Sequence, residues 1–373
     1  MRPMPIALLL LLLLHVYLGA RLLPALAHPL ALAGTAALLA ATLLLIPAAF
    51  AGRRGRNRRA ADRWTWAGMT ALGLFSMLAV LTLGRDVLLL AGAVLGLPPL
   101  AGPSAAAVPL LALAAVAIGA VGARRTAAVR EVDVPVDGLP PALHGFTIVQ
   151  VTDVHVGPTV KRAYVQRIVD AVNRLQPDAV ALTGDLVDGR VADLRDDVAP
   201  LAGLRARHGS FFVTGNHEYY SGVAEWTDAL RGLGLTVLEN AHRVLDHGGA
   251  RLVLAGVRDF SAGQVVAGHR SDPQAAIAGA PADAAVRVLL AHQPRSAAAA
   301  ADAGFDLQLS GHTHGGQFWP WNLFVRFQQP FTAGLHRLQD LWVYTSRGTG
   351  YWGPPKRFGA PSEITLLKLV PAS

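Results

Sequence analysis

The hydrophobic pattern divides the chain into two parts of different character. Up to residue 123, long runs of Leu and Ala dominate, whereas from about residue 140 short apolar runs alternate with segments of helical periodicity. A helix needs about 20 apolar residues to cross a bilayer. Four runs in the first part approach that length, at residues 8–27, 30–51, 64–83 and 105–121. We therefore expect an all-α transmembrane region at residues 1–125, a linker at residues 126–143 and a globular domain at residues 144–373.

Two of the apolar runs allow more than one interpretation. The run at residues 87–97 is short, and Pro98, Pro99 and Pro103 follow it, so we expect an interfacial or re-entrant piece there. For the first run a signal peptide is the alternative, because Ala-rich sequence follows the apolar core. The further spans downstream favour a retained membrane helix, and so does the presence of only one basic residue, Arg2, before the core.

Basic residues gather beside the apolar spans. The densest cluster occupies residues 52–59, and Arg124 and Arg125 close the fourth span. Cytoplasmic loops are enriched in Lys and Arg, and four crossings place both clusters on that side. We therefore expect a multi-pass protein of the inner cell membrane with a cytoplasmic globular domain. A full crossing by residues 87–97 would reverse the side.

The composition agrees with a chain that has the lipid bilayer as a partner. Of the 373 residues, 52% are hydrophobic and only 16% are charged, which is too apolar for an ordinary soluble enzyme. The chain has no cysteine, which excludes disulfides and thiolate metal sites. The net charge of +8 would suit nucleic acid, but much of the arginine lies at membrane boundaries, so we expect no nucleic-acid partner.

The second part alternates predicted strands and helices. Apolar runs predict strands at residues 146–152, 179–183, 211–214, 286–291, 305–309, 342–345 and 364–369, with a hairpin joining residues 243–245 and 251–255. Apolar positions at helical spacing predict helices at residues 160–175 and 226–233. Strands that alternate with helices indicate a layered α/β domain.

Metal-binding types of side chain follow the predicted strands. They are Asp153, His155, Asp185, Asn216, His292, His312 and His314. Carboxylate, amide and imidazole groups without sulfur suit divalent metals such as Mn, Fe or Zn. Seven such groups exceed the needs of one ion, whereas two ions bridged by one carboxylate would use them all.

Two further residues beside this set suit acid catalysis. His217 follows Asn216 and is placed to protonate a leaving oxygen or to bring a positive charge to a phosphoryl oxygen. Asp188, three residues after Asp185, could hold that imidazole by a hydrogen bond. Two metal ions would clamp the attacking and leaving oxygens of a displacement at phosphorus and lower the pKa of a bound water. The residues therefore indicate a hydrolase acting on phosphoester bonds.

The five motifs, in this order, resemble those of the calcineurin-like metallophosphoesterase superfamily. Asp-x-His, Gly-Asp-x-x-Asp, Gly-Asn-His-Glu, His and Gly-His-x-His are all present between residues 146 and 369, and residues 311–317 are similar to its membrane-anchored bacterial branch. The resemblance implies a four-layer α/β/β/α sandwich. It also implies one metal ion held by Asp153, His155, Asp185 and His314, a second held by Asp185, Asn216, His292 and His312, and a catalytic dyad of His217 and Asp188.

On this basis we expect a membrane-anchored enzyme with two divalent metal ions that hydrolyses a phosphomonoester, a phosphodiester or a pyrophosphate. Related branches of the family include enzymes that split UDP-diacylglucosamine, so we expect a lipid-linked or nucleotide-linked, amphiphilic substrate. The alternative is a catalytically silent, metal-binding membrane scaffold or sensor. The intact His217 and Asp188 argue against it, because a scaffold has no need of an acid dyad.

Two features outside the motifs stay open. The aromatic stretch at residues 318–324 directly follows the last motif. It suits a lid over an acyl chain, a segment that enters the bilayer interface, or ordinary packing of a loop. Arg347, Lys356 and Arg357 suit either phosphate and anionic lipid headgroups or plain surface charge.

Overall fold

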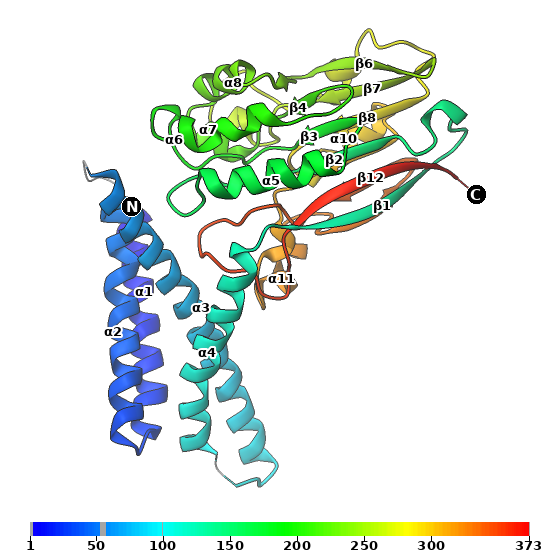
Figure 1. Ribbon diagram of the computed structural model, residues 1–373. Coiled ribbons are helices and arrows are strands. Elements are labelled where there is room, and N and C mark those ends of the chain that lie inside the picture. The colour runs from blue at the N-terminus through cyan, green and yellow to red at the C-terminus, as the bar shows by residue number, and fades with distance from the viewer. Residues whose placement is uncertain (1–2, 53–56, 99, 373) are drawn as a thin grey trace. The chain divides into compact units, whose positions relative to one another are not determined.

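The computed structural model describes residues 3–52, 57–98 and 100–372 and divides into two compact units (Figure 1). The first takes in the chain up to Arg124 together with Gly353–Phe358, and the second takes in Arg125–Trp352 and the chain from Gly359 onward. Residues 53–56, in the middle of the basic cluster, lie outside the described residues.

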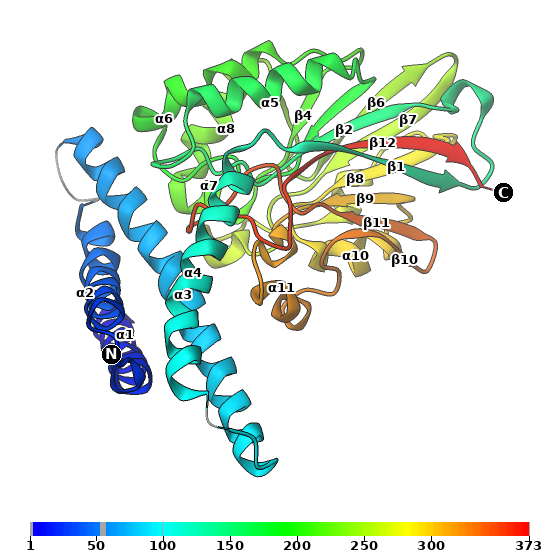
Figure 2. The same ribbon diagram turned by 60° about the horizontal axis from the view of Figure 1, so that its bottom comes forward.

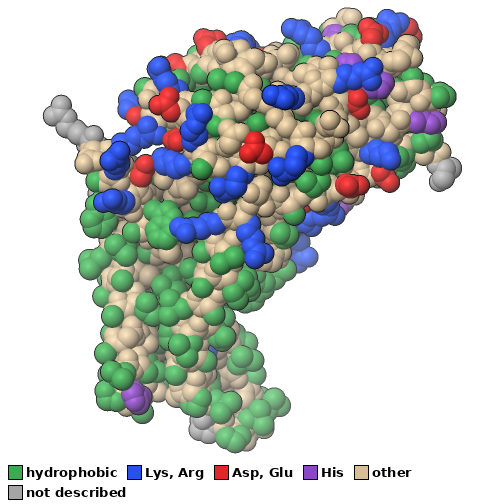
Figure 3. Space-filling view, viewed as in Figure 1, with side chains coloured by type: hydrophobic (Ala, Val, Ile, Leu, Met, Phe, Trp, Pro, Cys, Tyr) green, Lys and Arg blue, Asp and Glu red, His purple; other side chains and the backbone are tan. Residues whose placement is uncertain are grey.

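Long apolar helices make up the first unit. They are α1 (Pro3–Leu22), α2 (Pro29–Gly52), α3 (Arg58–Val94) and α4 (Ala101–Arg124), with the short 3-10 helix η1 (Leu23–Ala25). Among the described residues, these four helices are long and apolar enough to cross a membrane. Hydrophobic side chains cover their outer surface (Figure 3). Exposure of such an apolar surface to water is unfavourable, whereas its contact with lipid tails is not.

Most of the run at residues 87–97, for which we expected an interfacial or re-entrant piece, belongs to a longer helix. Residues 87–94 complete α3, which ends at Val94 and whose 37 residues rise about 55 Å at the usual pitch. The neighbouring charges of Arg85 and Asp86 do not interrupt the helix, because these side chains pair with each other at 3.3 Å and Arg85 also donates to Ser104 Oγ at 3.0 Å. The helix-breaking prolines come only after its end.

The segment Gly353–Phe358, which we expected in the globular domain, belongs to the helical unit. The backbone N–H of Arg357 donates to the carbonyl of Gly119, and Lys356 Nζ donates to the carbonyl of Gly73, both at 2.8 Å. Both basic side chains are buried, so neither is plain surface charge. Glycine is needed at 119 because a Cβ there would press against Lys356.

Two six-stranded mixed sheets form the second unit. Their strand orders are β1-β12-β2-β3-β4-β5 and β10-β11-β9-β8-β7-β6. The first sheet holds β1 (Ala128–Val136), β2 (Thr147–Val151), β3 (Ala179–Leu182), β4 (Ser210–Phe212), β5 (Thr236–Val237) and β12 (Glu363–Pro371). The second holds β6 (Ala241–His247), β7 (Ala250–Gly256), β8 (Val286–Leu290), β9 (Leu307–Ser310), β10 (Gly334–Leu338) and β11 (Leu341–Thr345). One core joins the sheets, with Ile148 and Ala181 of the first packed in the same cluster as Leu254 and Leu309 of the second.

Helices cover the outer faces of both sheets (Figures 1 and 2). The α-helices described in this unit are α5 (Arg162–Arg174), α6 (Val191–Val198), α7 (Asn216–Ser221), α8 (Val223–Gly232), α9 (Pro273–Ile277), α10 (Ala297–Asp302) and α11 (Trp321–Phe324), and α11 lies outside both sheets. The apolar spacing that predicted α5 places Val165, Ile168 and Val172 on its buried side. On the other sheet, Ala297 of α10 packs with Leu289 of β8. The expected four-layer α/β/β/α sandwich is thereby confirmed.

Residues 128–136 form strand β1 instead of the linker that we expected. The strand pairs in parallel with β12, from Ala128 opposite Glu363 to Val136 opposite Pro371. Its alternation buries Val134 and Val136, as one face of a strand requires. Pro135 is tolerated because β1 is an edge strand of the sheet.

The topology brings the sequence motifs to one place. Strands β2, β3 and β4 are parallel in the first sheet, and β7, β8 and β9 are parallel in the second. The carboxyl ends of parallel strands share one edge of a sheet, where α/β proteins form their binding crevices. Each of the five motifs follows the carboxyl end of one of these strands, namely β2, β3, β4, β8 or β9.

Candidate metal centre

The loops after these strands have strained backbone. Of nine non-glycine residues with positive φ in the described chain, six belong to this region: Asp153, His155, Asp185, His312, His314 and Gln317, with φ between 51° and 68°. Left-handed backbone costs an L-residue roughly 1–2 kcal/mol, and such strain clusters at functional sites. It also explains how His312 and His314, one residue apart, both reach buried partners.

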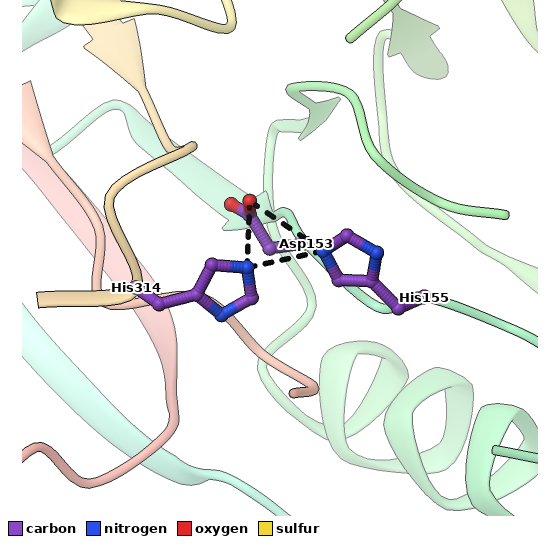
Figure 4. Close-up of side chains that lie close together, drawn as sticks. All are labelled: Asp153, His155 and His314. Carbon is purple, nitrogen blue, oxygen red and sulfur yellow. Dashed lines mark hydrogen bonds and ion pairs between the residues drawn. The ribbon is translucent and has the colours of Figure 1, made fainter. Parts of the chain in front are cut away.

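A first cluster joins Asp153 and His155, which follow β2, to His314, which follows β9. Asp153 Oδ1 lies 3.3 Å from His314 Nε2 and 4.0 Å from His155 Nε2, and the two imidazole nitrogens are 3.0 Å apart. Figure 4 shows the three groups pointing toward one another. All three are buried. Carboxylate and imidazole atoms that converge in this way can hold a metal ion.

A second cluster joins Asp185, after β3, to His292, after β8, and His312, after β9. Asp185 Oδ2 lies 3.1 Å from His292 Nε2, and His292 Nε2 lies 3.2 Å from His312 Nδ1. His292 Nδ1 donates to the carbonyl of Thr183 at 2.8 Å. This hydrogen bond fixes the tautomer, so that Nε2 faces Asp185, in the manner of metal-binding histidines.

Asp185 connects the two clusters. The oxygen that faces His292, Oδ2, also lies 4.0 Å from His155 Nε2 of the first cluster. The other oxygen accepts the backbone N–H of His217 at 2.8 Å. Of the seven metal-type residues named from the sequence, six are therefore brought together around this one carboxylate.

The seventh, Asn216, is the first residue of α7. Its side chain is buried, and its Oδ1 has no hydrogen-bond partner among the described residues. A buried polar atom left in this state costs about 1–3 kcal/mol. A cation held beside this oxygen would remove that penalty, so Asn216 fits a metal centre.

The charges of the cluster separate its groups into different protonation states. Burial raises the pKa of Asp153. Burial also opposes the charge on Asp185, but His292 outweighs it and holds the pKa of Asp185 well below its usual range. The same pairing raises the pKa of His292, while burial and the charge of His292 lower the pKa of His312 to about 3. His312 is thus a neutral imidazole, the form that binds metals.

His217 and Asp188 form a close pair at the edge of the centre. His217 Nδ1 donates to Asp188 Oδ1 at 2.5 Å. Burial disfavours the imidazolium, yet the hydrogen bond to Asp188 and the charge of Asp185 raise the pKa of His217 to about 9. Asp188 also accepts from His155 Nδ1 at 3.2 Å, and this second partner was not foreseen from the sequence.

Glu218 organises the backbone of the centre, a role that we did not predict. The buried carboxylate accepts the N–H groups of Asp185, Leu186 and Gly215 at 3.0, 2.7 and 2.7 Å. Burial and the charge of Asp185 raise the pKa of Glu218 to about 7. The only sequence signal for this role was the position of Glu218 as the last residue of the Gly-Asn-His-Glu motif.

Two exposed aromatic rings border His217, and no sequence signal pointed to either. The Tyr220 ring lies 5.5 Å and the Trp352 ring 5.8 Å from the imidazole, both edge-on. Trp352 is held in place by Gln317, whose Nε2 donates to its carbonyl and whose Oε1 accepts its N–H, both at 2.8 Å. The two rings form walls beside the candidate acid.

The motifs and this geometry define a metallophosphoesterase domain. The calcineurin-like phosphoesterase model matches residues 146–316, a range that contains all five motifs. An uncharacterized metallophosphoesterase of Aquifex aeolicus is 32% identical over 226 residues, which span 60% of this chain and 84% of that protein. The chain belongs to the calcineurin-like phosphoesterase family.

The names of two vertebrate relatives mention a membrane as well as a metallophosphoesterase domain. "Transmembrane protein with metallophosphoesterase domain" of Danio rerio is 39% identical over 262 residues, and its Bos taurus counterpart is 42% identical over 266 residues. Each match covers 68% of this chain and 60% of the relative. The chain therefore matches about three fifths of the length of these relatives.

We expect Gly215→Ala to disrupt the centre. A Cβ at Gly215 would overlap Asp185 Oδ1 and the backbone N of Asp185, displacing the carboxylate that connects the two clusters. Loss of a group that orients a ligand typically weakens metal binding about 10- to 100-fold, which titration calorimetry with Mn²⁺ would measure. Gly232→Ala is the matched control, because nothing lies within 4 Å of a Cβ there. Unchanged affinity in a folded Gly215→Ala protein would contradict the expectation.

Proposed function

We propose that this membrane protein is a phosphoesterase that uses two divalent metal ions to hydrolyse a phosphoester or pyrophosphate bond. The observation that carries the proposal is the His217–Asp188 pair, which lies beside the two ligand clusters that Asp185 connects. A silent scaffold would need the two clusters to bind metal ions. It would not need a proton donor beside the carboxylate that connects them. The four apolar helices are proposed to anchor the domain, with its catalytic side in the cytoplasm.

The proposed ligand sets follow the two clusters. One ion would be held by Asp153, His155, Asp185 and His314, and the other by Asp185, Asn216, His292 and His312. The orphaned oxygen of Asn216 and the neutral ring of His312 support this assignment. When bound, the ions supply positive charge to the phosphoryl oxygens and lower the pKa of a water molecule. Their identity is proposed as Mn, Fe or Zn from the oxygen and nitrogen ligands.

His217 is proposed as the general acid. Its Nδ1–H is committed to Asp188, and its Nε2 lies 3.9 Å from Asp185 Oδ2, so the second N–H faces the shared carboxylate. A pKa of about 9 keeps the imidazole protonated at neutral pH. The proton on Nε2 would pass to the leaving oxygen of the ester as the bond to phosphorus breaks. Asp188 would stabilise the imidazolium before that transfer.

The walls beside His217 suit an amphiphilic substrate. Because the acid faces the leaving group, that group would lie against the rings of Tyr220 and Trp352, which are more than half exposed. Flat aromatic surfaces accept nucleobases by stacking and alkyl chains by apolar contact. We therefore propose a lipid-linked or nucleotide-linked phosphoester, reached from the membrane that holds the helices.

The decisive experiment measures hydrolysis of alkyl phosphomonoester and phosphodiester substrates, whose alkoxide leaving group needs a proton, by the full chain in detergent with added Mn²⁺. We expect metal-dependent turnover that falls about 10²- to 10⁴-fold in His217→Ala, the usual contribution of a general acid, with metal content unchanged. His336→Ala, the same change at an exposed histidine, should keep full activity. Metal binding without turnover in the unaltered protein would instead support the silent scaffold.

Asp185→Asn tests the shared ligand. Since the carboxylate connects both clusters, we expect both ions to be lost, as measured by mass spectrometry of metals in the purified protein. Asp340→Asn is the control, because it makes the same change at a fully exposed carboxylate in the turn between β10 and β11. Retention of two ions in Asp185→Asn would exclude the shared role.

Metal uptake is expected to release protons. His292 has a raised pKa in the metal-free protein, but it must be neutral to bind a metal ion. The apparent affinity should therefore rise as pH rises and fall as pH falls, because protons and metal compete for the same nitrogen. Calorimetry in two buffers of different ionisation enthalpy would count the protons released. A binding enthalpy that does not depend on the buffer would contradict this expectation.

A further inference from the structure

An exposed apolar surface lies next to the metal centre in sequence but takes no part in it. Residues 318–331, named here the aromatic loop, contain α11 and the 3-10 helix η7 (Val325–Phe327). In the described part of the α/β unit, eleven large apolar side chains are exposed, and five of them fall within residues 319–327. They are Trp319, Trp321, Leu323, Phe324 and Phe327, named here the apolar patch, and Phe327 is 74% exposed.

The rings of the patch form one surface. Phe324 lies 6.1 Å from Trp321 and 6.4 Å from Phe327, measured between ring centroids. The guanidinium of Arg326 lies 5.1 Å from the centre of the Phe327 ring. Fully covering one such side chain contributes about 1.5–3 kcal/mol, and a contiguous exposed patch of this kind marks a binding surface.

The base of the aromatic loop is fixed, which gives the patch a definite orientation. Thr313 Oγ1, inside the last metal motif, donates to the carbonyl of Thr332 at 2.6 Å. Arg295 donates to the carbonyl of Gln328 at 2.7 Å. Gly316 packs directly on the backbone of Asn322, where a Cβ would not fit. Figure 2 shows α11 outside the two sheets, and Leu323, Phe324 and Phe327 are exposed there.

The composition of the aromatic loop decides which partner fits. Its 14 residues include two Trp and four Phe, one Arg and no acidic residue. Trp and other aromatic side chains concentrate where the bilayer meets water, and basic residues attract anionic headgroups. The chain also carries four candidate spans, which keep a bilayer within constant reach of the loop. A soluble protein partner would need a separate encounter.

We propose that the aromatic loop inserts the apolar patch into the interface of the membrane that anchors the chain. Arg326 would face the lipid phosphates while the rings of Phe324 and Phe327 enter the upper part of the acyl chains. Because Thr313 and Gly316 tie the loop to the turn that carries His314, insertion would hold the metal centre at the depth of the headgroups. The inference concerns membrane contact and does not depend on catalytic activity.

Labelling at single cysteines tests this insertion, since the chain has no cysteine of its own. Phe327→Cys and Leu323→Cys, both at exposed positions, would each carry the environment-sensitive fluorophore NBD. The full chain would be reconstituted in vesicles of phosphatidylcholine and phosphatidylglycerol in equal parts. Asp340→Cys is the matched control, because that side chain is fully exposed in the turn between β10 and β11.

We expect a blue-shifted emission at 323 and 327, and loss of that emission when a nitroxide is placed near the top of the lipid acyl chains. The probe at 340 should show neither effect. A blue shift without nitroxide quenching would show that protein covers the patch, from a second copy or another partner, and would overturn the proposal. Emission typical of water at both test positions would overturn it as well.

Discussion

Burying several charges in one place is the constraint on which this structure depends. An unpaired ion in a protein interior costs several kcal/mol, yet Asp153, Asp185 and His292 are almost inaccessible to water. The charges are tolerated because each faces an opposite charge or a donor, as Asp185 faces His292. Such pairing demands atoms within about 4 Å from loops that are far apart in sequence. The two stacked sheets supply that proximity.

The strained loops follow from the same demand. Side chains on an extended strand alternate between faces, so a strand alone cannot direct two neighbouring histidines to the same centre. Left-handed backbone at His312 and His314 brings one to His292 and the other to Asp153. Glu218 compensates part of the strain by accepting three backbone N–H groups. The remainder is balanced by the packed core between the sheets.

The two units expose surfaces of opposite polarity. The helices expose leucine and valine along their length, which is stable only in lipid, whereas the α/β unit spreads Lys and Arg over the face seen in Figure 3. The aromatic loop has an intermediate character, since it is apolar, exposed and free of acidic residues. That combination is the reason for assigning it to the boundary between lipid and water.

The sequence by itself determined most of the elements and the kinds of side chain that meet at the centre. Apolar periodicity located α5, β2, β3 and β8 to within a few residues, because burial of one face imposes that period. The spacing of the motifs identified the metal-type residues and the His217–Asp188 pair. Strand β1 and the continuation of α3 were missed. The strand is defined by its pairing with β12, and the charges of Arg85 and Asp86 find partners on other helices, Ser104 and Arg21. The tertiary structure alone decided that Asp185 connects the two clusters, that Asp188 accepts from two imidazoles, and that Tyr220 and Trp352 border His217. These features depend on distances between loops that no local pattern encodes.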